Sequence, residues 1–183
     1  MKKIIILALA LVASAATTQT FAQETKMVGG AEMYPTKDIV DNAVNSKDHT
    51  TLVAAVQAAG LVETLKSEGP FTVFAPTNDA FGKLPEGTVE TLVKPENKAT
   101  LTSILTYHVL AGRYSAQAIM KAIKAGNGKA EFATVQGGKL WASMTGNKIV
   151  LTDEKGGKSM VTISDVNQKN GVIHVVDTVL LPN

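Results

Sequence analysis

The histidines are the first residues to examine for acid–base or metal chemistry, because the chain has three of them and no cysteine. His49, His108 and His174 are scattered, and no two have the spacing that a helical or loop zinc site requires. The sequence Gly-x-Ser-x-Gly, which marks a serine nucleophile on a sharp turn, does not occur. We therefore predict no catalytic residue and no metal site.

Two neighbouring segments resemble sites but are better explained as turns. Gly157-Lys158-Ser159 matches only the end of a phosphate-binding loop, because Thr152 stands where that loop needs its first glycine. Asp153 and Glu154 lie in the turn just before it, and their simplest interpretation is a solvated pair. We therefore expect no bound cofactor.

The composition predicts a folded domain that does not bind nucleic acid. The chain has 183 residues, of which 45% are hydrophobic and 19% are charged. Arg113 is the only arginine, so the forked donors that bind phosphates and base edges are almost absent. Without cysteine there are no disulfides, and the stability must come from the core of one domain.

The N-terminal residues predict export. Met1-Lys2-Lys3 is followed by the apolar run Ile4 to Val12 and by small residues that end at Ala22, which is typical of a signal peptide over residues 1–22. The apolar run is too short for a membrane anchor, so we expect a periplasmic or secreted protein without a membrane span. Residues 23–34 are polar and contain glycine, and we expect a flexible lead-in there.

Hydrophobic periodicity places helices mainly in the first half and strands mainly in the second, which predicts an α+β fold. Residues 70–76 are the early exception, because this β-rich run leads directly into a capped helix start at 77–81. The other helices or helical turns are expected at 38–44, 52–59, 61–65, 89–93, 96–110 and from Ser115 to Gly126. The other strands are expected at 130–136, 139–145, 148–152, 160–164 and 172–181.

Three motifs of the chain resemble the fasciclin domain family. The segment from Gly69 to Phe81, GPFTVFAPTNDAF, resembles the first signature block of that family. The segment from Asn170 to Pro182, NGVIHVVDTVLLP, resembles the second block, and Tyr107-His108-Val109-Leu110 resembles the Tyr-His motif between them. The resemblance covers about residues 35–183 as a single domain. It implies a β wedge or sandwich of about seven strands with α-helices along one edge, and enzymatic activity is not usual for the family.

The motif residues have physical roles in this interpretation. Thr77 or Asn78 is expected to cap the helix after the early strand, and Asp79 lies in its positively polarised first turn. His108 is expected to be buried and hydrogen-bonded to Asp79 or Thr77. We assign structural roles to Thr77, Asn78, Asp79, His108, His174 and Asp177.

Four residues are candidates for contact with a partner, because they resemble positions linked to adhesion in the family. Tyr107 and His108 resemble residues linked to integrin recognition. Asp165 and Val166 correspond to an Asp-Ile pair that precedes the second block in animal members. Arg-Gly-Asp does not occur.

The resemblance and the missing catalytic groups favour an exported, non-catalytic module that mediates cell adhesion or binds a surface protein, a matrix protein or an extracellular polysaccharide. The alternative is an exported small-ligand-binding protein or enzyme, with His108 and Asp79 as an acid–base pair in a pocket between helices and sheet. A third possibility is an envelope protein that binds only itself. The sequence leaves the oligomeric state open.

Overall fold

The computed structural model of the protein describes residues 24–183. The predicted signal peptide, residues 1–22, lies outside the described residues. Within the described part of the chain, no helix has both the length and the apolar composition needed to cross a bilayer.

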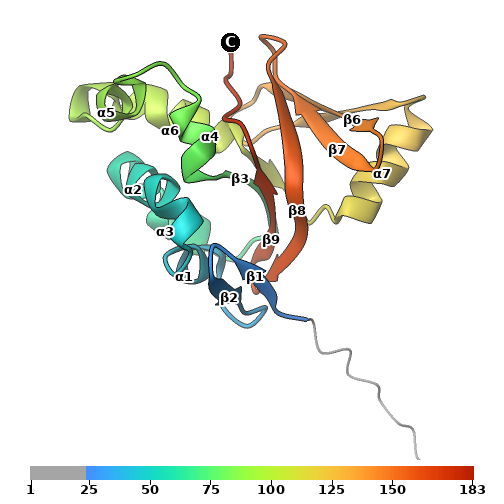
Figure 1. Cartoon of the computed structure of the whole chain (residues 1–183), viewed down its shortest axis with the longest axis horizontal. Coiled ribbons are helices and arrows are strands. Elements are labelled where there is room, and N and C mark those ends of the chain that lie inside the picture. The colour runs from blue at the N-terminus through green and yellow to red at the C-terminus, as the bar shows by residue number, and fades with distance from the viewer. Residues whose placement is uncertain (1–23) are drawn as a thin grey trace, which may run out of the picture.

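A seven-stranded mixed sheet forms the centre of the fold (Figure 1). Its strand order is β4-β3-β9-β8-β7-β6-β5, and β3 runs parallel to β9 whereas the other neighbouring pairs are antiparallel. A separate hairpin joins β1 to β2. The strands are β1 (Lys26–Val28), β2 (Ala31–Met33), β3 (Phe71–Pro76), β4 (Val109–Ala111), β5 (Lys129–Ala133), β6 (Lys139–Thr145), β7 (Lys148–Thr152), β8 (Lys158–Gln168) and β9 (Gly171–Val176).

The helices lie in two places (Figure 1). The first six gather beside β3 and β9, whereas α7 lies at the other end of the sheet and packs against β5 and β6. The helices are α1 (Ile39–Ala43), α2 (Thr50–Ala59), α3 (Val62–Lys66), α4 (Asn78–Gly82), α5 (Thr88–Leu92), α6 (Lys98–Tyr107) and α7 (Ala116–Ala125), with 3-10 turns η1 (Lys47–His49) and η2 (Pro95–Asn97).

The alternation of side chains along β3 separates two hydrophobic cores. Phe71, Val73 and Ala75 belong to the core that β3 and β9 share with the helices α1 to α6. Phe74 points to the opposite face and joins a second core, which α7 and β5 to β8 complete through residues such as Ile119. Because β3 and β9 are buried on both faces, they read as apolar runs in the sequence.

The structure confirms the α+β class and the central position of the C-terminal strand. β9 lies between β3 and β8, and all six of its residues are buried. The strand ends at Val176, five residues earlier than the sequence predicts, because the chain from Asp177 leaves the sheet and is held by side-chain hydrogen bonds.

Two other expectations were wrong. Residues 24–34 are not a loose lead-in but contain the β1–β2 hairpin, which is anchored because Val28 and Met33 are buried in the first core. The predicted helix over 96–110 ends at Tyr107, and the following residues form β4, which pairs with β3. Backbone pairing with a distant strand therefore overrides the helical periodicity of the local sequence.

Candidate functional site

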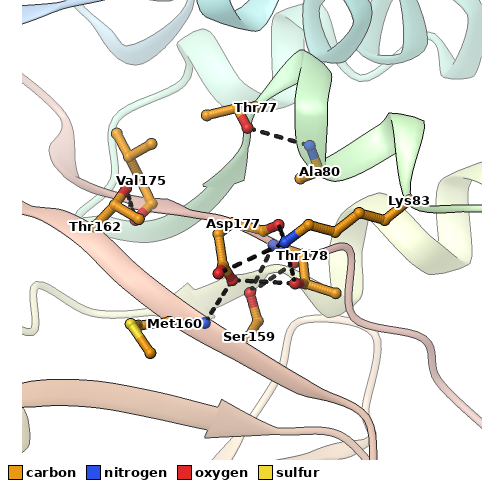
Figure 2. Close-up of polar contacts among 9 residues, drawn as sticks. All are labelled: Thr77, Ala80, Lys83, Ser159, Met160, Thr162, Val175, Asp177 and Thr178. Carbon is orange, nitrogen blue, oxygen red and sulfur yellow. Dashed lines mark hydrogen bonds and ion pairs between the residues drawn. The ribbon is translucent and has the colours of Figure 1, made fainter.

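The first signature block joins β3 to the helices. The side chain of Thr77 caps α4, because its Oγ1 accepts a hydrogen bond from Ala80 N at 3.2 Å (Figure 2). Asn78 crosses to η1 and α2, where its Oδ1 accepts from Thr51 N in α2 at 3.0 Å and its Nδ2 donates to Lys47 O in η1 at 2.8 Å. Asp79 is exposed in the first turn of α4. These contacts fix the angle between strand, α4 and α2.

His108 is buried, with 2% of its surface exposed, and both ring nitrogens are bonded. Burial lowers its pKa to about 4, so the ring is neutral and carries one proton. Nδ1 lies 2.8 Å from the carbonyl of Ile104 and must donate, which leaves Nε2 to accept from Leu180 N at 3.0 Å. The expected partners Thr77 and Asp79 are therefore wrong, and the ring has no nitrogen left for an acid–base pair with Asp79.

His174 connects the sheet to the start of α7. Its ring stacks on Phe74 at a centroid distance of 5.7 Å, and burial lowers its pKa. Nε2 lies 2.8 Å from the carbonyl of Tyr114, and Nδ1 accepts from Asp165 N at 3.3 Å. Asp165 has a left-handed φ of 55° at an irregular point of β8, and its Oδ1 accepts from Ala116 N at 2.7 Å in the first turn of α7.

Three of the four predicted contact residues are buried. Tyr107, His108 and Val166 expose 0%, 2% and 1% of their surface, so none of them can touch a macromolecule while the domain is folded. The hydroxyl of Tyr107 donates to Lys139 O and accepts from Glu154 N at 3.2 Å, and burial raises its pKa to about 12. Only Asp165 is partly exposed, and contact with a partner at this residue remains a prediction.

Asp177 holds the C-terminal segment against α4 and β8 (Figure 2). Its Oδ1 accepts from Met160 N at 2.8 Å. Lys83, the first residue after α4, donates to the Asp177 carbonyl at 2.6 Å. Thr178 is held beside it, because Ser159 Oγ donates to Thr178 O at 2.7 Å. Partial burial opposes ionisation of Asp177, but the hydrogen bonds and Lys83 outweigh it and lower the pKa of this carboxyl.

Sequence reasoning missed two buried polar residues that hold the second block in place. Asp153 is not a solvated residue, because it is 4% exposed and accepts from Gly157 N at 2.6 Å and Leu181 N at 3.0 Å. Asn170 accepts from Ile39 N at 3.1 Å and donates to Leu65 O at 2.7 Å. An Asp before a glycine turn was a visible signal for Asp153, whereas the partners of Asn170 are more than 100 residues away.

The comparisons with known proteins agree with this geometry. The Fasciclin domain family model matches residues 47–182, which include all three motifs. The chain belongs to the fasciclin domain family. This fasciclin domain is 44% identical to Protein sll1483 of Synechocystis over 87% of its own length and 82% of that protein.

More distant relatives come from other bacteria and from animals. The fasciclin domain is 37% identical to the Immunogenic protein MPB70 of Mycobacterium bovis, over 76% of this chain and 66% of the relative. It is 34% identical to human Periostin, over 74% of this chain but 15% of the relative. A FAS1 domain pair from the insect cell adhesion molecule fasciclin I shares the fold, with a TM-score of 0.70, 18% identity, and coverage of 79% of this chain and 51% of that structure.

The chemistry of the fasciclin motifs is internal to the fold. Hydrogen bonds to backbone groups are formed by the side chains of four motif residues: Tyr107, His108, His174 and Asp177. Among residues 24–183 there is no group of three or more side chains placed to hold a metal ion. The arrangement positions strands and helices.

Charged residues are distributed unevenly along the described chain. Residues 24–111 contain seven lysines and eleven carboxylates, whereas residues 112–183 contain nine basic residues and five carboxylates. Several lysines of the second half lie at one end of the sheet, because Lys129 pairs with Ser143 and Lys148 with Thr145 at the C-terminal end of β6. Helix α7, which packs on β5 and β6, adds Lys121 and Lys124. We call Lys121, Lys124, Lys129 and Lys148 the basic end.

Proposed function

We propose that this fasciclin domain is an exported, non-catalytic module that binds an acidic surface or matrix macromolecule through its basic end. The proposal rests on the difference in exposure between the motif residues and the lysines. The motif residues Tyr107, His108 and His174 are buried inside the fold, whereas the lysines of the basic end are exposed. Export is supported by the signal-like segment over residues 1–22.

The charge pattern favours an acidic partner rather than a neutral one. Residues 112–183 carry a formal charge of +4 and residues 24–111 carry −4, so the basic end attracts polyanions while the acidic half repels them. Lysine is suited to diffuse attraction of carboxylates and sulfates, because it acts as a point charge without fixed geometry. Met120, which precedes Lys121 on α7, is 40% exposed and adds an apolar contact on the same helix.

Binding to polyuronate, compared with neutral dextran, tests this proposal. A variant with Lys121, Lys124 and Lys148 changed to Gln should bind polyuronate about tenfold more weakly, since each exposed ion pair contributes up to about 1 kcal/mol. The matched control changes Lys47, Lys94 and Lys98 to Gln, which removes the same charge from the acidic half. Equal loss in both variants would show only a net-charge effect and would contradict a basic-end site.

The alternative of a His108/Asp79 enzyme is not supported by the geometry. The two side chains belong to different environments, one buried and one exposed, and both nitrogens of His108 are bonded elsewhere.

A further inference from the structure

An apolar cavity lies inside the first core, between the helices and the sheet. It has a volume of about 100 Å³ and is lined by α1, α2 and α3, by β3 and by the end of α6. Most of its wall is aliphatic, with residues such as Leu52, Val73 and Val166. The exposed side chains of Gln57, Thr64 and Val135 also line it, so the cavity reaches the surface.

One polar group at this cavity is left without a partner. His49 lines the cavity and is 3% exposed, and its Nε2 is the one buried side-chain nitrogen or oxygen among residues 24–183 that makes no hydrogen bond. The carbonyl of Ala75 partly opposes the fall in the pKa of His49, but it makes no hydrogen bond of normal geometry with Nε2. Buried polar groups usually form hydrogen bonds, so this nitrogen is expected to bond to a group that enters the cavity.

The other polar residues of the wall are already satisfied or solvated. Both nitrogens of His108 are bonded, and Thr106 donates to Thr102 O at 2.7 Å. Gln57 and Thr64 are exposed at the rim. A water molecule needs two to four polar partners, and the interior of this cavity offers one, so the site suits an apolar body with one polar group better than water.

The state of His49 indicates which polar group fits. Burial lowers its pKa, so the ring is neutral, and Nδ1 lies 2.9 Å from Ser46 Oγ. Depending on the direction of that bond, Nε2 is either a donor or an acceptor, and a hydroxyl matches both cases. An engineered apolar cavity of about 150 Å³ in another protein binds benzene, which sets the scale for the occupant here.

We propose that this cavity, which we call the His49 cavity, binds a small uncharged molecule that carries one hydroxyl on an apolar body no larger than about one aromatic ring. The hydroxyl bonds to Nε2 of His49, and the body lies against the aliphatic wall. This site is separate from the basic end and does not depend on the function proposed above.

The test uses phenol and benzene, which have the same ring and differ by the hydroxyl. In the protein without its signal segment, phenol should shift the imidazole nitrogen resonances of His49. It should shift those of His108 less, because both nitrogens of that ring are already bonded although the ring lines the cavity, and it should leave those of His174 unchanged. Benzene should shift the methyl groups of Leu52, Val73 and Val166 but have a smaller effect on the His49 nitrogens. No shift at His49, or equal shifts at all three rings, would overturn the proposal.

A variant separates the hydroxyl bond from cavity filling. His49→Phe keeps a ring and removes Nε2, so the affinity for phenol should fall about fivefold while the affinity for benzene stays within about twofold. Equal changes for both compounds would contradict a hydrogen bond to His49. The wild-type resonance experiment decides the question even if this variant does not fold.

Discussion

The backbone N–H of Leu180 donates to Nε2 of His108 over 3.0 Å, although the two residues are 72 positions apart. This bond connects the Tyr-His motif with the second signature block, and it fixes the imidazole as the tautomer with the proton on Nδ1. The histidine that most resembles a catalytic residue therefore acts as a buried link between the end of α6 and the C-terminal segment.

Replacement of His108 by Phe should destabilise the domain by about 3 kcal/mol. The change leaves the Leu180 N–H and the Ile104 carbonyl without a buried partner, and each unsatisfied group costs about 1–3 kcal/mol. Urea denaturation measures the difference. Asp79→Ala, which removes an exposed acid from the first turn of α4, is the control and should cost at most about 1 kcal/mol. Equal losses in the two variants would contradict the role assigned to His108.

Stability should decrease as the pH falls below 6.5. Burial lowers the pKa of all three histidines below 6.5, and that of His108 to about 4. The unfolded chain therefore binds more protons than the folded chain in this range, so the stability is complete above the unfolded pKa and is lost towards the folded one. His108 alone should account for about 2 kcal/mol between pH 7 and pH 5.

Urea denaturation at several pH values checks this dependence. His108→Phe should show a shallower decrease than the wild-type protein, because one of the three titrating rings is removed. A wild-type stability that stays constant between pH 7 and pH 5 would show that the rings are not held neutral.

Removal of the Tyr107 hydroxyl should lower the free energy of unfolding by about 2 kcal/mol. Tyr107→Phe keeps the ring in the second core but leaves Lys139 O and Glu154 N without their bonds to the hydroxyl. The matched control is Tyr34→Phe, because Tyr34 is 38% exposed and its hydroxyl bonds only to the exposed Glu32. Thermal or urea unfolding of the two variants should therefore differ, and similar values would contradict the buried link.

Asp165 combines a strained backbone with a helix cap, and substitutions can separate the two. Asp165→Asn keeps both the tolerance of positive φ and the acceptor for Ala116 N, so it should fold with nearly unchanged stability. Asp165→Ala loses both and should cost about 1–3 kcal/mol. If Asp165→Asn is also strongly destabilised, the charge next to His174 matters more than the cap.

The sequence predicts the parts of this fold that depend on local patterns. The apolar runs of β3 and β9 identify two strands buried on both faces, and Ser115 predicts the start of α7 because its hydroxyl caps Ala118 N. Short strands are missed, since β4 has three residues and is defined by its pairing with β3 rather than by its own sequence.

The sites are harder to predict than the strands, because their partners are distant in the sequence. A buried His108 follows from its place on the apolar face of the predicted helix over 96–110, but nothing near it in the sequence points to Leu180. The same is true of Asn170, whose partners lie on α1 and α3. Burial of Tyr107 and Val166 likewise depends on packing in the two cores and not on the motif in which each stands.

The most direct test of the proposed function is the amount of surface or matrix material that the domain captures when either the basic end or the buried hydroxyl of Tyr107 is changed. The two variants are Lys121, Lys124 and Lys148 to Gln, and Tyr107→Phe, both confirmed to be folded at the assay temperature. We predict that the lysine variant loses capture of acidic polymer about tenfold and that Tyr107→Phe retains it. Retained capture by the lysine variant, or loss in folded Tyr107→Phe, would contradict a binding surface at the basic end.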